Sequence, residues 1–431
     1  MDEEALGFDD FSVEMQDFTV EKQGKFDRIW KATEGGSLHQ HPLIHGGTVF
    51  FGSLNHCVYA MDAVTGLERW RFRTNGMILS SSPVYHEGMI YIGSYDHCLY
   101  ALEASTGRLV WKFEARDRIF STPYVGAGGA VYFGSADHMV YSLDAMTGGL
   151  NWKFRTSDKV TATPTEHEGK VYFGSFDQNF YCVGARDGRL VWKFPTNGEI
   201  HLLNPVTVHD GAVFFGSFDN NLYALESDTG KEIWRLRMGQ YGNYMSPILH
   251  EGMLYQSSRD NTLHAITLQG EEVWRIARGE LICIPLIQDG RIYVGCEDYN
   301  MYCLDMKGKE LWKFPTQGMT YKKPVVAGGR LYFTSWDCNL YAMDLKTGSL
   351  LWKFRTEGSP AYFPPPNENF TLRVKVKGGE LDEKAGRKKK YDTGEKDEEG
   401  GGGFYKSRIT YGGSSKYREK GGYGSGGEDD F

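Results

Sequence analysis

The stretch Ala101–Leu–Glu–Ala–Ser–Thr–Gly–Arg–Leu–Val–Trp111 decides the fold, because close relatives of it recur about every forty residues. The same eleven positions run from Ala60 to Trp70, Ser142 to Trp152, Ala224 to Trp234 and Ala342 to Trp352. A short β-type run that ends in Gly-Ser or a variant of it precedes each copy, as in Val131–Tyr–Phe–Gly–Ser135. Short strands repeated at this period are typical of a β-propeller.

One proline marks the opening strand of each repeat. The prolines lie 38 to 42 residues apart and are Pro42, Pro83, Pro123, Pro164, Pro205, Pro247, Pro285 and Pro324. Proline is tolerated at the first residue of a strand, because its missing N–H breaks no ladder bond there. Eight aligned prolines predict an all-β fold, an eight-bladed β-propeller of four-stranded antiparallel blades.

Two turns in each repeat carry their own signals. An Asx residue stands between the second and third strands: Asn55, Asp96, Asp137, Asp177, Asp219, Asp260, Asp298 and Asp337. Its short side chain can bond the turn backbone two residues on. Thr-Gly pairs such as Thr65–Gly66 follow the third strand, and we expect the glycine to take a positive φ.

Composition divides the chain into three parts. Residues 1–24 form an acidic segment, residues 25–358 hold the repeats, and residues 359–431 form a Pro-bounded tail rich in Gly, Lys and Glu. The low apolar content predicts that both terminal segments are disordered. The repeat region is nearly neutral, which gives no overall electrostatic case for nucleic acid as the main partner. No apolar stretch reaches the roughly twenty residues of a membrane span.

Cysteine usage bears on the compartment. The seven cysteines are an odd number scattered among strands and turns, and they are Cys57, Cys98, Cys182, Cys283, Cys296, Cys303 and Cys338. We interpret them as free, packed thiols in a reducing compartment. The first twenty residues show no secretory leader, and the expected location is therefore cytoplasmic.

The recurring pattern Ala–x–Asp/Glu–x–x–Thr–Gly–x–x–x–Trp resembles the tryptophan-docking motif of the pyrroloquinoline-quinone (PQQ) repeat family. Members of that family include the quinoprotein alcohol dehydrogenases and the non-enzymatic outer-membrane assembly lipoprotein of the BAM complex, which this chain resembles most in style. The resemblance covers roughly residues 28–358. It implies that blade-end tryptophans pack between neighbouring blades, and the candidates are Trp30, Trp70, Trp111, Trp152, Trp192, Trp234, Trp274, Trp312 and Trp352.

Nine tryptophan strands are one too many for eight blades. In propellers of this family the N-terminal strand often completes the last blade. The resemblance therefore predicts that the Trp30 strand closes the ring beside residues 322–344, with the Trp352 strand as its rival.

The enzymes of the family imply a quinone site that this sequence does not match. They resemble one another in a vicinal Cys-Cys disulfide, a calcium or lanthanide held by Glu, Asn and Asp, and a catalytic Asp. No two cysteines are adjacent in this chain, and we predict no catalytic, cofactor-binding or metal-binding residue. His56, His97 and His138 are possible metal ligands, but they occupy equivalent turns of successive blades. That spacing is too wide for one ion, since its ligands approach to about 2 Å.

Loops between blades are expected to meet at one mouth of the central channel. The candidate binding rim consists of His41, Ser82, Phe120, Thr122, Thr163, His201, Asn204, Tyr241, Tyr244, Ser246, Tyr321 and Lys323. Aromatic side chains beside adaptable hydrogen-bonding groups suit a recognition surface. The alternative is a structural role, in which the small Ser and Thr side chains cap strand starts.

These features favour a non-catalytic, monomeric scaffold that binds other proteins through its channel-mouth loops and terminal tails. The first alternative is a PQQ- or metal-dependent oxidoreductase. The second is a nucleic-acid-associated factor that uses the C-terminal tail, where Arg387–Lys390 and Phe404–Gly413 supply charge and stacking groups.

Overall fold

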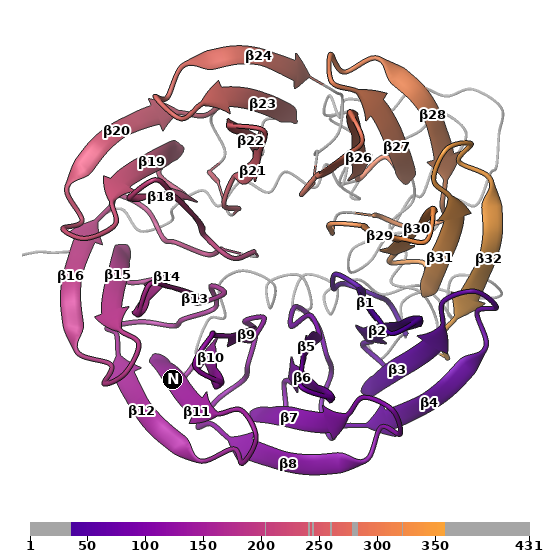
Figure 1. Cartoon of the computed structure of the whole chain (residues 1–431), viewed down its shortest axis with the longest axis horizontal. Helices are drawn as coiled ribbons and strands as arrows, with labels where there is room; N and C mark the ends of the chain where they lie inside the picture. Colours follow the sequence, from indigo (N-terminus) through magenta and orange to yellow (C-terminus); the bar gives the residue numbers. More distant parts are fainter. Residues whose placement is uncertain are drawn as a thin grey trace, which may run out of the picture.

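The computed structural model describes residues 36–357, except residues 203, 240–241, 244, 259–260, 278–282 and 321. Within these residues the strands form eight four-stranded sheets arranged as a ring (Figure 1). The predicted all-β, eight-bladed propeller is confirmed. The segments 1–24 and 359–431, whose disorder was predicted, lie outside the described residues.

Each blade is a meander of four consecutive antiparallel strands, with the first strand at the channel and the fourth at the circumference (Figure 1). The bounds, blade by blade, are β1 Leu43–His45, β2 Thr48–Gly52, β3 Cys57–Asp62 and β4 Glu68–Arg73; β5 Val84–His86, β6 Met89–Gly93, β7 Cys98–Glu103 and β8 Leu109–Glu114; β9 Tyr124–Val125, β10 Ala130–Gly134, β11 Met139–Asp144 and β12 Leu150–Arg155; β13 Thr165–His167, β14 Lys170–Gly174, β15 Asn179–Gly184 and β16 Leu190–Pro195; β17 Thr207–His209, β18 Ala212–Gly216, β19 Asn221–Glu226 and β20 Glu232–Arg237; β21 Ile248–His250, β22 Met253–Ser258, β23 Thr262–Thr267 and β24 Glu272–Ala277; β25 Leu286–Gln288, β26 Arg291–Gly295, β27 Asn300–Asp305 and β28 Glu310–Pro315; and β29 Val325–Ala327, β30 Arg330–Thr334, β31 Asn339–Asp344 and β32 Leu350–Arg355.

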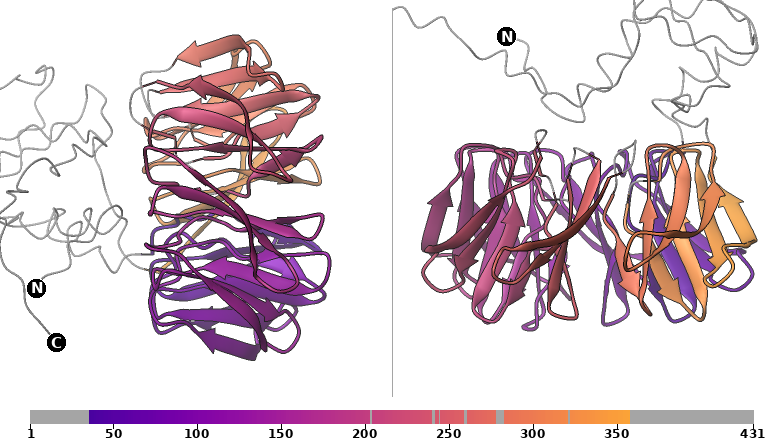
Figure 2. Two further views of the ribbon diagram at one scale, coloured as in Figure 1. Left: turned by 90° about the vertical axis from the view of Figure 1, so that its left-hand side faces the viewer. Right: turned by 90° about the horizontal axis from the view of Figure 1, so that it is seen from above.

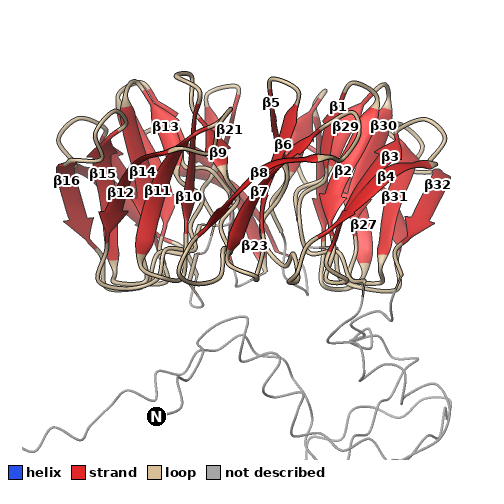
Figure 3. Cartoon of the chain, turned by 90° about the horizontal axis from the view of Figure 1, so that it is seen from below, coloured by secondary structure: helices blue, strands red, loops and turns tan. Residues whose placement is uncertain are grey.

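The core lies between the blades. Seen from the side, the blades form a flat ring with their turns gathered on its two faces (Figures 2 and 3). The second strand of a blade, such as β2, is buried along its whole length because neighbouring blades cover both of its faces. One typical cluster joins Tyr91 of the second blade to Phe133 and Leu143 of the third.

The outer strands have a different burial pattern, because only one of their faces is covered. In β32 the side chains of Trp352 and Phe354 are half-buried and alternate with the exposed Leu351, Lys353 and Arg355. This period-two pattern is typical of a strand with one covered face. It places a row of polar side chains on the circumference of the ring.

The prediction that the Trp30 strand closes the ring is wrong, and its rival is confirmed. β32 pairs with β31, with Trp352 opposite Ala342, in the register that the outer strand takes in the other blades. The hairpin turn at Thr347–Gly348 makes this pairing local, whereas a strand from the N-terminus would close a loop of most of the chain. Trp30 itself lies outside the described residues.

Candidate functional site

The tryptophan of each outer strand contacts the next blade around the ring. Trp111 Nε1 donates a hydrogen bond to the carbonyl of Ala145 at 3.0 Å. The indole also lies against Gly148, where an added Cβ would be 2.7 Å from Trp111 Cδ2. Glycine is required there for a second reason, because its φ is +72°. Trp70, Trp152, Trp192, Trp234 and Trp352 make the same pair of contacts, with a carbonyl and a glycine of the next blade.

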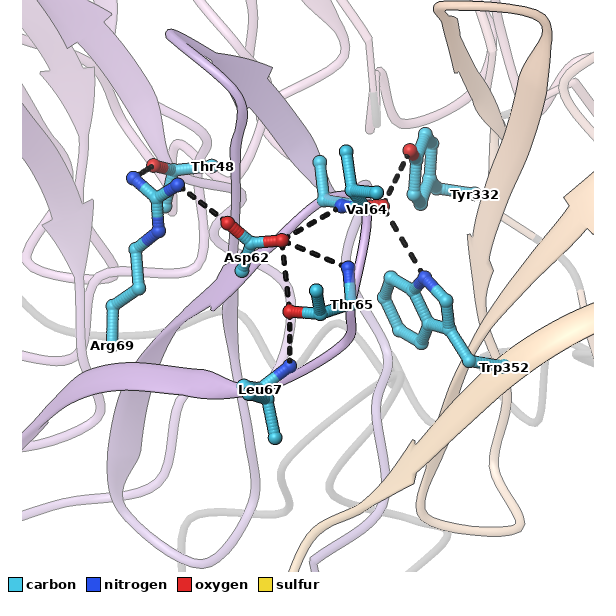
Figure 4. A network of polar contacts seen from close by, with 9 residues as sticks. Thr48, Asp62, Val64, Thr65, Leu67, Arg69, Tyr332 and Trp352 are labelled. Carbon is cyan, nitrogen blue, oxygen red and sulfur yellow. Dashed lines mark hydrogen bonds and ion pairs between the residues drawn. The ribbon is translucent and has the colours of Figure 1, made fainter.

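A tyrosine strengthens several of these joints, including the one that closes the ring. Tyr332 Oη donates to the carbonyl of Ala63 at 2.9 Å, and Trp352 Nε1 donates to the same oxygen at 3.2 Å (Figure 4). Asp62 orders the receiving turn by accepting from the Thr65 amide and by pairing with Arg69 at 2.7 Å. The Arg69 guanidinium, followed by the Thr65 bonds, holds the pKa of Asp62 well below its usual value.

The Asx residue between the second and third strands forms another joint between blades at six positions: Asn55, Asp96, Asp137, Asp177, Asp219 and Asp337. Asp137 Oδ1 accepts from the Met139 amide at 3.1 Å, as the turn chemistry predicts. Its Oδ2 accepts from Tyr141 Oη at 2.6 Å and from the amide of Arg116, in the preceding blade, at 2.9 Å. Burial, and then the bond to Asp137, raise the pKa of the Tyr141 phenol.

The first blade carries Asn55 at this position, and the structure explains the exchange. The group that faces it across the closing junction is a carbonyl instead of an amide. Asn55 Nδ2 donates to the Glu357 carbonyl at 3.1 Å and to Tyr59 Oη at 2.7 Å. A carboxylate could make neither donation.

The three histidines that the sequence marked as possible ligands follow these Asx residues. His56, His97 and His138 have φ angles of 68°, 69° and 70°, and the same left-handed position is filled by Gln178 and Asn220 in later blades. The position therefore serves the turn. The described residues contain no group of three His, Cys, Asp or Glu side chains that could hold a metal ion. All seven cysteines are buried free thiols.

Several of the predicted rim residues meet as links between blades. The His41 amide donates to Ser82 Oγ at 3.0 Å, and the Ser82 amide donates to Thr122 Oγ1 at 3.0 Å. His41 Nδ1 lies 3.3 Å from the Lys323 carbonyl, which extends this chain of contacts across the closing junction. The side chains of His41, Ser82 and Thr122 thus join four successive blades, from the eighth to the third.

On the far side of the channel, Asn204 and Ser246 form a separate link. Asn204 Nδ2 donates to the Ser246 carbonyl at 3.0 Å, and its Oδ1 accepts from the Ser246 amide at 2.9 Å. These residues therefore link neighbouring blades. A binding role for the same residues remains a prediction.

The other rim residues are packed into the mouth of the channel. Phe120, Thr163 and His201 are buried, and so are Ser82, Asn204 and Ser246. Phe120 meets Tyr95 edge-on at a centroid distance of 4.7 Å, and the Arg118 guanidinium lies over both rings. Tyr241, Tyr244 and Tyr321 lie outside the described residues.

The most deeply buried basic groups at this mouth are His39, His201 and Lys322, of which the sequence-based rim included only His201. His39 stacks on Trp336 at 4.1 Å with an interplanar angle of 7°, and His201 Nδ1 lies 2.8 Å from Thr161 Oγ1. Burial, and then the positive charge of Lys322, lower the pKa of each histidine to about 3. Burial lowers the pKa of Lys322 itself to about 7. Only proximity to an aligned proline could have pointed to His39 and Lys322.

The sixth blade departs most from the repeat. Gln256 is fully buried at a position where the fifth blade has Phe215. His264 replaces the tyrosine that elsewhere bonds the Asx residue, and its Nε2 and Nδ1 lie 2.6 Å from Thr262 Oγ1 and Glu272 Oε2. The junctions on either side of this blade rely on Leu236 and Ile276 where other blades use phenylalanine. The sixth blade therefore combines buried polar side chains with fewer aromatic contacts at its two junctions.

The residues at this mouth do not fit the quinone site that the family resemblance implies. Their side chains are bonded or packed against one another, and the sequence has no adjacent cysteines for a vicinal disulfide. Within the described ranges, no helix is long and apolar enough to span a membrane.

Solved structures with a similar ring include BamB from Moraxella catarrhalis, which is 19% identical and has a TM-score of 0.59 over 68% of this chain and 90% of that one. The computationally designed Ika8 protein is 14% identical, with a TM-score of 0.63 over 75% and 98% of the two chains. The quinohemoprotein alcohol dehydrogenase from Comamonas testosteroni is also 14% identical, with a TM-score of 0.58 over 71% and 72%. These identities show a shared fold alone.

No curated protein matches this sequence. The family described as outer membrane protein assembly factor BamB matches it four times, over residues 21–121, 99–205, 177–281 and 267–368. The matches overlap and together span the whole ring. The chain therefore belongs to the BamB family of PQQ-repeat propellers.

Proposed function

We propose that this protein is a non-catalytic scaffold that binds other proteins along the circumference of its ring. The family description names an assembly factor, and a scaffold role is consistent with that description. The observation that carries the proposal is the exposure of large apolar side chains on the outer strands. Val191 is 48% exposed and Leu351 is 47% exposed, each directly before a tryptophan that packs into the ring.

These apolar side chains recur at equivalent places. In the described part of the chain the exposed ones on outer strands are Leu109, Val110, Leu150, Leu190, Val191, Ile233, Val273, Leu311, Leu350 and Leu351. Exposed apolar side chains that lie together mark interaction sites, and adjacent pairs stand at the same place in three blades: Leu109–Val110, Leu190–Val191 and Leu350–Leu351. The links between blades hold them at fixed separations, which suits a protein that positions several partners.

The competing class is a quinone- or metal-dependent oxidoreductase. Likeness to the quinohemoprotein enzyme concerns the fold, and a fold does not determine function. A nucleic-acid role for the C-terminal tail rests on residues outside the described part of the chain. We therefore retain the scaffold as the proposed function.

The test compares the full chain with two surface variants. Val191→Asp and Leu351→Asp place a charge on outer strands of opposite sides of the ring (Figure 1). A third variant, Lys193→Ala, changes the same strand without touching the apolar position. We expect partners cross-linked to the wild type and identified by mass spectrometry to be lost from an aspartate variant that keeps the wild-type Tm, and to be kept by Lys193→Ala.

Two results would contradict the scaffold role. One is a stoichiometric bound quinone or metal in the purified protein together with quinone-dependent alcohol oxidation. The other is a partner set that neither aspartate variant changes.

A further inference from the structure

Every outer strand carries a cation directly after its tryptophan. These residues are Arg71, Lys112, Lys153, Lys193, Arg235, Arg275, Lys313 and Lys353, and all eight are exposed. An outer strand is paired on one side only within the described chain. Its other edge presents backbone donors and acceptors to any extended segment of suitable charge.

The strand β32 differs from its neighbour β4 in how its cations are matched. In β4, Arg69 and Arg71 form ion pairs with Asp62 and Glu68 at 2.7 and 2.8 Å. In β32, Lys353 and Arg355 form no ion pair with any residue in the described part of the chain. The cations of β32 are therefore available to an acidic partner.

The N-terminal part of the chain enters the ring at the end of this strand. The Gly36 carbonyl accepts a hydrogen bond from Thr356 Oγ1, one residue after β32 ends. A Cβ at Gly36 would collide with the Glu357 carbonyl, so the contact is close. Residues 1–35 are thus connected to the ring at Gly36, beside the end of β32. At about 3.3 Å per extended residue, a chain of that length is several times longer than the strand.

The sequence of this N-terminal part complements β32. Residues 1–21 contain eight acidic side chains and no Lys or Arg. From Phe11 to Gln16 apolar side chains alternate with polar ones, and Glu14 stands at the centre of the polar set. This alternation predicts a β-strand with one apolar face. The exposed face of β32 alternates in the same way, with Lys353 at its centre.

We propose that residues 11–16 pair with the outer edge of β32 of the same molecule and add a fifth strand to the eighth blade. In either strand direction, Glu14 then lies beside Lys353, and the apolar Val13 and Met15 lie beside the half-buried Trp352 and Phe354. The tether gives the segment a high effective concentration at this strand compared with the seven others. A second copy is a poorer occupant, because pairing β32 with β32 would bring Lys353 and Arg355 of both copies together.

The pairing has a consequence for binding. It closes the open edge of β32, while the edges of the other outer strands stay accessible. The N-terminal segment would therefore block the edge of β32 to other partners. An acidic partner that competes for β32 would displace the segment. This inference does not depend on the proposed scaffold function.

Carbodiimide cross-linking of the full chain tests the position of the segment. The reagent joins a carboxylate to a lysine amine that it contacts. We expect Glu14 to be joined to Lys353 at least about tenfold more often than to Lys193, which has the same place in β16 on the opposite side of the ring (Figure 1). Lys353→Arg keeps the charge without the amine and should lose the cross-link.

Hydrogen exchange on the same full-length protein gives an independent readout. Amides of residues 350–355 should exchange about tenfold faster in the Glu14→Lys, Asp17→Lys variant. Adding Lys353→Glu and Arg355→Glu to that variant should restore slow exchange, and Lys353→Arg alone should leave it slow. A mixture of isotopically labelled and unlabelled protein separates the two occupants, since only links within one molecule support the proposal. Links between molecules, equal reaction at Lys193 and Lys353, or exchange unaffected by the charge reversals would each overturn it.

Discussion

The indole nitrogen of Trp352 donates a hydrogen bond to the carbonyl oxygen of Ala63 at 3.2 Å, across 289 positions of sequence. Trp111 and Ala145 make the same bond within the body of the ring, at 3.0 Å. The junction between the last and first blades is therefore built like the others. Closure depends on side chains that join intact blades, and within residues 36–357 each blade is built from four consecutive strands.

The glycine under each indole gives a direct test of this joint. Gly148→Ala would place a methyl group 2.7 Å from the Trp111 ring and strain a φ of +72°, and we expect it to lower the free energy of unfolding by about 3 kcal/mol. Gly169→Ala is the matched control, because its φ is +74° and nothing lies within 4 Å of its added Cβ. Strain alone should cost about 1 kcal/mol there. If urea unfolding showed equal losses of free energy for the two variants, contact with the indole would not be the reason that position 148 requires glycine.

Asn55→Asp tests why one blade departs from the aspartate rule. The carboxylate would face the Glu357 carbonyl, to which the Asn55 amide donates at 3.1 Å, whereas Tyr59 could donate to the carboxylate as Tyr141 does to Asp137. We expect a loss of about 2 kcal/mol in unfolding free energy at pH 7. Because the new group is neutral only when protonated, part of the loss should be recovered near pH 4. A variant as stable as the wild type at pH 7 would contradict the assignment.

His201 should make the protein acid-labile. Its pKa is lowered to about 3 in the folded protein from the ordinary 6.5, so below pH 6.5 the unfolded chain binds more protons than the folded one. Stability is therefore fully present above pH 6.5 and falls as the pH drops toward 3, by up to about 1.4 kcal/mol per pH unit.

The variant His201→Asn removes this titration and can keep a bond to Thr161. Unfolding free energies measured at pH 8, 6 and 4.5 should fall less steeply for the variant than for the wild type. His39 contributes in the same direction in both proteins, so it cancels in the comparison. Parallel curves would mean that His201 does not titrate as the structure predicts.

Gln256 is the clearest conflict between a residue and its place in the repeat. Its side chain is fully buried, and its Oε1 has no hydrogen-bond partner within the described residues. Gln256→Leu removes the unsatisfied Oε1 but also the Nε2 donations to the Met245 and Ser257 carbonyls at 3.3 and 2.7 Å, so the free energy of unfolding should change by less than about 1 kcal/mol. Phe215→Gln, the reverse change at the same place in the fifth blade, should lower it by about 3 kcal/mol. A loss of about 2 kcal/mol or more from Gln256→Leu would show that the Nε2 bonds outweigh the unsatisfied Oε1.

The sequence predicts the blades because every repeat carries the same local turn and strand signals. Pro123, Asp137 and Gly148 each act within their own blade, through turn chemistry and strand pattern, and such signals are read from a few neighbouring residues. The choice between the Trp30 and Trp352 strands was different. Both strands carry a tryptophan followed by a lysine, but only Trp352 follows a Thr-Gly turn, at Thr347–Gly348, which pairs its strand with the strand just before it.

The channel mouth was predicted less well, for a physical reason. Ser82 and Asn204 were identified as residues near the mouth, but their exposure depends on hydrogen bonds to neighbouring blades about forty positions away. His39 and Lys322 gave no periodic signal, because their burial results from the closing of the ring. The repeat pattern does not predict the burial or contacts of residues that differ between blades.

The closure of the ring by β32 is the central claim, and one comparison tests it most directly. Thermal unfolding of the full chain should show that Trp352→Ala lowers the Tm as much as Trp111→Ala does, because both remove one equivalent joint. Trp30→Ala should leave the Tm close to that of the wild type. If Trp30→Ala lowered the Tm as much as Trp111→Ala while Trp352→Ala did not, closure of the ring by β32 would be contradicted.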